Sequence, residues 1–290
     1  MSSRRFERMV VGLPQGMGNQ PAVEAAAGLA EFLHIELLAT FVADATLCAL
    51  AELPGRELRS LDQGWQAIDV AQITRDIDHA TAGARRRFAE SVKSRTIKTS
   101  FDVIAGAQVM ASLIRADDIV AIIEPTHPGE RITRQFTGLL DAAFETATAI
   151  LVVPRRIART SGPIMAVASG PEDASIRVAL EIAAALNERL IVLTRPGALL
   201  SPEILADAEQ LGVQVEQIAA SGALADASAP APSPRSKERL RVVTRSLVPD
   251  DVHRLFSTLH GVPLLVIEPE RAELAVEQEK QEKQEKHELR

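Results

Sequence analysis

Short runs of β-branched and other apolar residues alternate with long alanine-rich stretches along most of the 290-residue chain. This alternation is typical of β-α-β units, in which helices cover a parallel sheet. The apolar runs are nearly continuous, as expected for strands buried on both faces. The sequence therefore predicts an α/β protein built on doubly wound parallel sheets.

The first half predicts five strands with helices between them. We expect the strands at Arg8–Leu13, Ile35–Val42, Ile97–Val103, Ile119–Glu124 and Ile150–Pro154. We expect the helices at Pro21–Leu33, Ala67–Lys93, Ala107–Arg115 and Thr133–Thr146. Asn19-Gln20-Pro21 favours a helix start, with Asn19 as the cap and Pro21 at an early helical position.

A second, shorter series of elements begins near Ser161. Its expected strands are Ile164–Ala168, Leu190–Thr194, Val213–Ile218, Leu240–Thr244 and Val262–Ile267. Its expected helices are Ala174–Asn187, Pro202–Leu211 and Asp250–Leu259. The second half thus repeats the order of the first in fewer residues.

Two segments align between the halves. Ala30–Leu38 aligns with Ala183–Ile191 at an offset of 153 residues, and Ala149–Val153 aligns with Pro263–Ile267 at an offset of 114. The second half therefore lacks 39 residues of the middle of the first. We predict one domain at residues 1–157, a shortened second domain at 158–270 and a charged tail at 271–290.

Composition and charge exclude several function classes. The formal net charge is −7, whereas binding to nucleic acid or anionic membrane depends on an excess of Lys and Arg. Aromatic residues make up only 3% of the chain, which disfavours surfaces that stack on bases. The single cysteine, Cys48, excludes an internal disulfide and a multi-cysteine metal site. We expect no nucleic-acid partner and no bound metal.

Hydropathy argues against a membrane protein. No apolar stretch approaches the ~18–20 residues that span a bilayer. The short apolar run Met9–Val11 is stopped by Pro14 and Gly16, so it does not form the core of a signal peptide. We expect a cytoplasmic protein.

The order and spacing of these elements resemble the universal stress protein family in its tandem, two-domain form. The resemblance is carried by the alanine-rich helix and leucine-rich strand at Ala25–Leu38 and Val178–Leu193, and by the strand Ala149–Pro154. It implies two five-stranded parallel sheets of the adenine-nucleotide alpha hydrolase-like type. It also implies that the two halves pair through their last strands as a pseudo-dimer.

The resemblance implies ATP binding by an Asp after the first strand and by a Gly-x2-Gly-x9-Gly-Ser/Thr loop after the fourth. This chain has no Asp after its first strand, and the loop spacing falls on Pro125, Pro128, Gly138 and Leu139. Proline has no N–H group to donate to a phosphate, and its φ is fixed near ~−65°. We therefore predict that ATP binding is lost or weakened.

Two stretches remain candidates for an anion or nucleotide site. Arg131, Arg134, Thr137 and Gly138 lie near the start of a predicted helix, where free N–H groups favour negative charge. Gly16 and Gly18 follow the first strand, where close backbone approach to a ligand is possible. The alternatives are a surface loop with capping residues and solvated arginines, and a glycine turn that needs positive φ.

No other residues make a catalytic or metal-binding pattern. His127 lies in the candidate loop without a recognisable nucleophile or acid beside it, and His253 and His260 alone do not complete a metal site. The isolated Trp65 is interpreted as a loop anchor, with a dimer or ligand contact as the alternative.

Two functions from different classes follow. The first is a non-enzymatic stress-response or regulatory protein that acts by binding protein partners, by self-association or by binding a small ligand, without a cofactor. The alternative is an ATP-binding protein or slow ATP hydrolase that uses the first domain, with ATP or AMP as its ligand.

Overall fold

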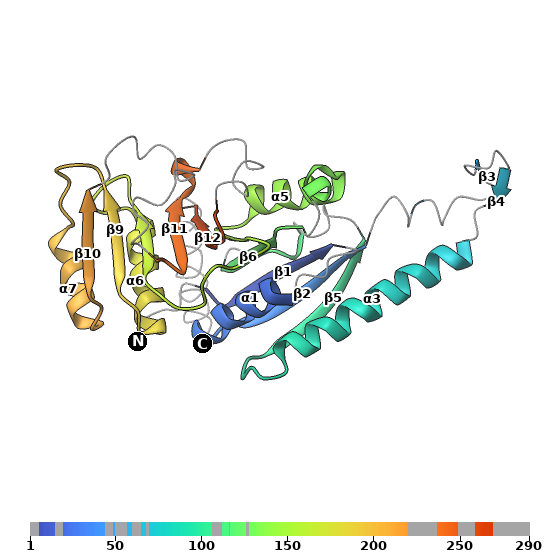
Figure 1. The fold of residues 1–290 in the computed structure, drawn as a ribbon, viewed down its shortest axis with the longest axis horizontal. Coiled ribbons are helices and arrows are strands. Elements are labelled where there is room, and N and C mark those ends of the chain that lie inside the picture. Colours follow the sequence, from blue (N-terminus) through green and yellow to red (C-terminus); the bar gives the residue numbers. More distant parts are fainter. Residues whose placement is uncertain are drawn as a thin grey trace, which may run out of the picture.

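The computed structural model describes residues 6–14, 20–43, 49, 57–59, 65–67, 70–105, 112–115, 117–125, 128–219, 237–248 and 259–268. Its main sheet has ten strands in the order β10-β9-β8-β11-β12-β7-β6-β1-β2-β5 (Figure 1). Several predicted features lie outside the described residues: the tail at 271–290, Cys48 and most of the helix Ala107–Arg115. The predicted helix Asp250–Leu259 also lies outside them, except for its last residue.

The strands and helices lie close to their predicted positions. The first half contains β1 (Arg8–Pro14), α1 (Gln20–Phe32), β2 (Glu36–Ala43), β3 (Glu57–Arg59), β4 (Trp65–Ala67), α3 (Val70–Val92), β5 (Thr99–Ala105), β6 (Asp118–Ile123), a 3-10 helix η1 (Pro128–Ile132), α5 (Arg134–Thr146) and β7 (Ala149–Val153). The second half contains β8 (Ile164–Val167), α6 (Ala174–Leu186), β9 (Leu190–Thr194), α7 (Pro202–Gln210), β10 (Val215–Ala219), β11 (Leu240–Thr244), a 3-10 helix η2 (Arg245–Leu247) and β12 (Leu264–Ile267). The antiparallel β3–β4 hairpin, which carries Trp65, was not predicted.

The predicted α/β class with parallel five-stranded sheets is confirmed, and the two sheets join edge to edge. Neighbouring strands run parallel from β10 to β12 and from β7 to β5. β12 and β7 pair antiparallel in the middle of the ten-stranded sheet. The last strands of the two halves therefore meet directly, which is the pairing that the resemblance implies.

The pairing of β7 with β12 is reciprocal. Leu151 lies opposite Leu265, and these two residues are equivalent in the alignment of the two strands. Ile150 pairs with Val266, while Leu264, the equivalent of Ile150, pairs with Val152, the equivalent of Val266. Such reciprocal pairing is how two copies of one surface meet about a two-fold axis. A local pseudo-two-fold axis therefore passes between Leu151 and Leu265.

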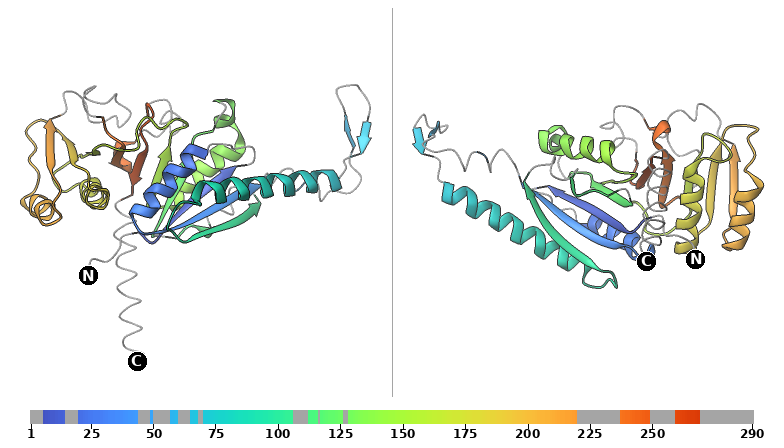
Figure 2. Two further views of the ribbon diagram at one scale, coloured as in Figure 1. Left: turned by 60° about the horizontal axis from the view of Figure 1, so that its bottom comes forward. Right: turned by 180° about the vertical axis from the view of Figure 1, so that it is seen from behind.

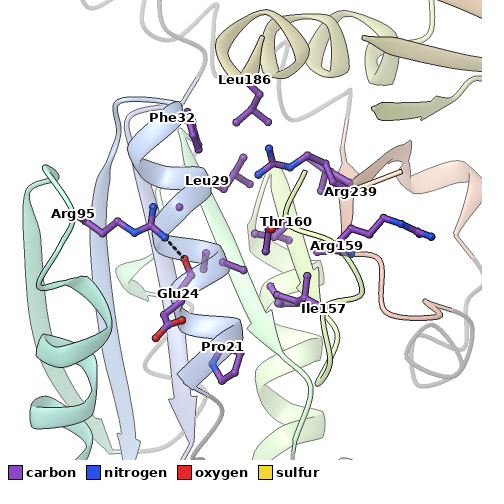
Figure 3. Close-up of a pocket in the computed structure, with 17 residues that line it drawn as sticks. Pro21, Glu24, Leu29, Phe32, Arg95, Ile157, Arg159, Thr160, Leu186 and Arg239 are labelled. Atoms are coloured by element: carbon purple, nitrogen blue, oxygen red, sulfur yellow. Dashed lines mark hydrogen bonds between the residues drawn. The ribbon is translucent and has the colours of Figure 1, made fainter. Parts of the chain in front are cut away.

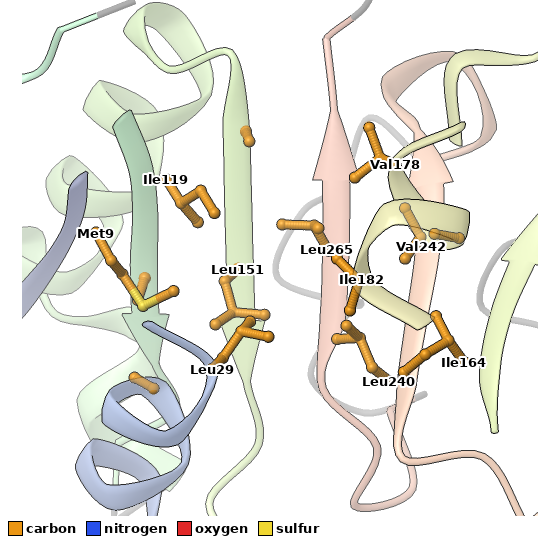
Figure 4. Close-up of a cluster of buried hydrophobic side chains, with 14 of the residues drawn as sticks. Met9, Leu29, Ile119, Leu151, Ile164, Val178, Ile182, Leu240, Val242 and Leu265 are labelled. Carbon is orange, nitrogen blue, oxygen red and sulfur yellow. The ribbon is translucent and has the colours of Figure 1, made fainter. Parts of the chain in front are cut away.

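One hydrophobic core continues across this seam. Buried side chains of the first half, among them Met9, Leu29 and Leu151, belong to the same cluster as Ile182 and Leu265 of the second. Figure 4 shows this cluster on both sides of the seam, beneath α1 and α6. The opposite face of the sheet has a second cluster, which α5 covers with side chains that include Phe136. Helices thus cover both faces, as a buried parallel sheet requires.

Helices α1 and α6 end in the same way. His34 and Asn187, which are equivalent in the alignment, both adopt left-handed backbone conformations, with φ of 54° and 52°. Ile35 N donates to Ala30 O at 3.0 Å, and Glu188 N donates to Ala183 O at 2.9 Å. In both cases the N–H of one residue bonds to the carbonyl five residues earlier, as in a Schellman motif. This ending turns the chain into the next strand in each half.

The long helix α3 is mostly exposed. Its buried residues, Ala84, Phe88 and Ser91, lie in its second half, and the first half runs past the sheet toward the β3–β4 hairpin (Figures 1 and 2). Asp76 and Asp78 are exposed on the surface of this helix. In the described residues, no helix combines the length and apolar character needed to cross a bilayer.

Candidate ligand site at the carboxyl edge of the sheet

The strand order of the first half places a topological switch point between β1 and β6. β1 connects through α1 to β2 on one side, whereas β6 lies on its other side. In open parallel sheets, ligands bind beyond the carboxyl ends of the strands at this switch in direction. The residues that follow β6, from Glu124 to the start of α5, therefore form the candidate site.

A buried ion pair occupies this edge. Glu124, which directly follows β6, is only 6% exposed. One carboxylate oxygen accepts a bond from the Arg131 guanidinium, and the other accepts the backbone N–H of Arg155 at 2.6 Å. Glu124 N in turn donates to Val153 O at 2.9 Å, which ties the segment to the end of β7. The positive charge of Arg131, predicted to bind an anion, is therefore neutralised within the protein.

The start of α5 is partly satisfied within the chain. Thr133 is its N-cap residue: its Oγ1 accepts Phe136 N at 3.4 Å and donates to Glu130 O at 2.7 Å. The two predicted residues Thr137 and Gly138 lie inside the helix, and Thr137 N donates to Thr133 O at 3.0 Å. The Thr133 hydroxyl thus binds one N–H group at the helix start, which is then not free for a ligand. In the family pattern, a Ser or Thr hydroxyl of this loop belongs to the phosphate-binding motif.

The other predicted site residues cannot be placed against this edge. Arg134 begins α5, but its side chain lies outside the described residues, as do Gly16, Gly18, His127 and His253. His260 adopts a left-handed conformation with φ of 49° before β12. Of the predicted site residues, the structure thus describes Arg131 on η1 and Thr137 and Gly138 within α5.

Comparison with known proteins identifies the fold. No family model matches the chain, and no curated protein matches it. Among solved structures, the chain is similar to a universal stress protein from Archaeoglobus fulgidus DSM 4304, with a TM-score of 0.61 and 13% identity over 92% of this chain and 98% of that one. This chain has the universal stress protein fold. A functionally unknown protein from Pseudomonas aeruginosa PAO1 aligns at a TM-score of 0.46 and 14% identity, over 94% and 98% of the two chains.

In this universal stress protein fold, the second half has its own switch point, between β8 and β11. Asp173, the N-cap of α6, fills it and accepts bonds from Ser169 N at 2.8 Å and Ser169 Oγ at 2.7 Å. Ser175 contributes its N–H at 3.0 Å and its hydroxyl at 2.8 Å, and Thr244 Oγ1 lies 3.4 Å away at the end of β11. Sequence analysis missed this residue because it sought an Asp at the strand end, whereas an Asp just before a helix is a cap signal.

Arg245 has a structural role in the same half. Its guanidinium donates to Val248 O at 3.3 Å and lies 4.9 Å from the ring centroid of Phe144 on α5. Because Phe144 belongs to the first half, this cation–π contact joins the two halves on the α5 face of the sheet.

We expect Glu124→Gln to lower the free energy of unfolding by about 1–2 kcal/mol, because the neutral amide leaves the guanidinium of Arg131 without its counter-ion. Urea denaturation measures this change. The matched control is Glu130→Gln on η1, which we expect to change stability by less than about 0.5 kcal/mol. Equal losses in the two variants would show that the Glu124–Arg131 pair contributes nothing specific.

Proposed function

We propose that this chain is a non-enzymatic stress-response or regulatory protein that acts by binding and does not hold ATP at the edge of its first half. The observation that supports this most directly is the buried Glu124 carboxylate, bound to Arg131 and to Arg155 N. It places a negative charge at the edge where the fold would receive a polyphosphate.

Electrostatics at this edge opposes a nucleotide. Anionic ligands are held by free N–H groups and unneutralised cations. Here Arg131 already pairs with Glu124, and a phosphate that approached the pair would meet a carboxylate that is nearly removed from solvent. Like charges repel more strongly where water is excluded. A ligand would have to break the ion pair before Arg131 could bind it.

Backbone chemistry acts in the same direction. Pro125 and Pro128 stand where the family pattern has glycines, and neither supplies an N–H donor. In the second half, β11 leads directly into the short helix Arg245–Leu247. The adjoining Asp173 carboxylate already accepts bonds from Ser169 and Ser175. We infer that neither switch point retains the means to hold a triphosphate.

Binding partners and location complete the proposal. We expect the protein to act in the cytoplasm through protein partners or self-association. Its net charge of −7 argues against nucleic acid as a partner. The seam between β7 and β12 is already used within the chain, so self-association would need another surface.

The test is to purify the protein, analyse co-purified nucleotide by mass spectrometry and measure phosphate release from ATP. We expect no stoichiometric nucleotide and no release above a buffer blank. Hydrolysis that Arg131→Met reduces would instead support the ATP hydrolase, because a contaminating enzyme would not respond to that substitution.

A further inference from the structure

A pocket of about 390 Å³ lies beside the seam, on the face of the sheet that α1 and α6 cover. Its walls come from both halves: α1 on one side, the end of α6 on another, and the segment that links β7 to β8 (Figure 3). This volume is within the range of small-molecule sites, which favour boundaries between packed units. The pocket is separate from the carboxyl-edge site, since neither Glu124 nor Arg131 lines it.

The lining is largely apolar. Leu29 and Phe32 of α1 face Leu186 of α6, and Ile157, Leu240 and Pro263 add further apolar surface. Phe32 is 42% exposed and is one of the exposed large apolar side chains of the described residues. An aliphatic group placed between α1 and α6 would remove this apolar surface from water.

One cation points into this apolar space. In Figure 3, the guanidinium of Arg239 is directed toward Leu29 and Leu186, and it lies 6.0 Å from the ring centroid of Phe32. Burial lowers the pKa of Arg239, because the charged form loses solvation. Its acidic neighbour, Glu188, is 3.9 Å away, and the Glu188 carboxylate also accepts Gly162 N at 2.9 Å. The charge of Arg239 is therefore only loosely compensated.

The remaining charged groups of the lining are arranged differently. Arg95 pairs with Glu31 at 2.9 Å and lies against Gly28. Arg159 lines the pocket, but its guanidinium extends away from α1 in Figure 3. Glu24 lies at the opposite end, near Pro21, where it accepts a bond from Gln20 at 2.8 Å. Of the described lining arginines that face α1, Arg95 is thus closely paired, whereas Arg239 is more loosely paired and is the one placed to attract a negative headgroup.

We propose that this seam pocket binds a small amphipathic anion, whose single acidic headgroup pairs with Arg239 and whose aliphatic body lies between α1 and α6. A polyanion such as a nucleotide fits poorly, because one inward-pointing cation and apolar walls do not neutralise several charges. A neutral lipid would desolvate the guanidinium of Arg239 further and leave it only Glu188, at 3.9 Å, as a counter-ion. A carboxylate on a medium-length alkyl chain satisfies both parts of the site.

Calorimetric titration of the full chain with decanoate tests the proposal. We expect binding of one decanoate with a Kd of about 100 µM or tighter. Decanol, which keeps the alkyl chain without the charge, is expected to bind at least about 10-fold more weakly, and so is butanoate, which keeps the charge with little apolar surface. No binding of decanoate at about 5 mM would overturn the proposal.

Variants locate the site. We expect Arg239→Gln to weaken decanoate binding at least about 10-fold, because a charge-assisted bond is lost. Arg177→Gln, the same change in an exposed arginine of α6 that does not line the pocket, should alter it by less than about two-fold. Thr160→Trp, at an exposed position of the lining, should block it, with thermal melting as the check on folding. Equal affinity in the Arg239 and Arg177 variants would contradict the proposed headgroup contact. The proposal is independent of ATP binding at Glu124, because the two titrations respond to different residues.

Discussion

Asp118→Asn is expected to lower the free energy of unfolding by roughly 3–5 kcal/mol, the typical cost of leaving a buried charge without its partner. Asp118 is fully buried at the start of β6. Its carboxylate accepts Arg8 Nε at 2.9 Å, Arg8 Nη2 at 2.6 Å and Arg115 N at 2.7 Å. These bonds raise the pKa of Arg8. The guanidinium stays charged when the carboxylate is replaced, because even the ordinary pKa of arginine lies far above neutral pH.

Urea denaturation of the wild type and the variant measures this loss. Arg8 and Asp118 lie opposite each other in the pairing of β1 with β6, so the substitution weakens the amino edge of the first half directly. The matched control is Asp117→Asn, one residue before the strand, for which we expect a change below about 0.5 kcal/mol. A loss at Asp118 no larger than that at Asp117 would mean that the ion pair does not hold these strands.

Gly162→Ala is expected to cost at least about 2 kcal/mol, from backbone strain and a steric clash together. Gly162 has a φ of 124°, which residues other than glycine rarely adopt. A Cβ atom at this position would lie 2.5 Å from the backbone atom Lys237 O. The bond from Arg239 N to Pro163 O at 3.0 Å holds the two segments together close to this point. The chain enters β8 at this point, so the second half must shift to accept the methyl group.

The comparison variant is Gly170→Ala, where an added Cβ atom meets nothing within 4 Å. We expect it to be neutral within about 0.5 kcal/mol in the same thermal and urea measurements. If the two alanine variants unfold at the same denaturant concentration, the close approach of Gly162 to Lys237 is not present in solution.

The elements with strong periodicity were predicted well from the sequence. The strands β9 and β11 have their predicted bounds, because each is a continuous run of buried residues. The two ends of α1 each differ by one residue from the predicted bounds Pro21–Leu33. The expectation of burial on both faces was wrong for β5, which is largely exposed. β5 is an outer strand of the ten-stranded sheet, as is β10, which is also largely exposed. Strand order depends on long-range pairing that periodicity does not encode.

The site was predicted only in part. The sequence alone shows that Pro125 and Pro128 supply no N–H donors where the family pattern has glycines. The role of Glu124 could not be, because it depends on η1 turning Arg131 back onto the carboxylate and on Arg155, 31 residues away, supplying its N–H. The seam pocket was likewise hidden, since Leu29, Leu186 and Arg239 come from segments that meet only after β7 pairs with β12.

Titration of the purified protein with ATP and Mg²⁺ by calorimetry most directly tests the claim that the Glu124–Arg131 ion pair and the prolines close the nucleotide edge. We expect no saturable heat up to about 1 mM ATP. One-to-one binding with a Kd below about 10 µM, weakened by Arg131→Met, would contradict that claim and return the first half to the nucleotide-binding class.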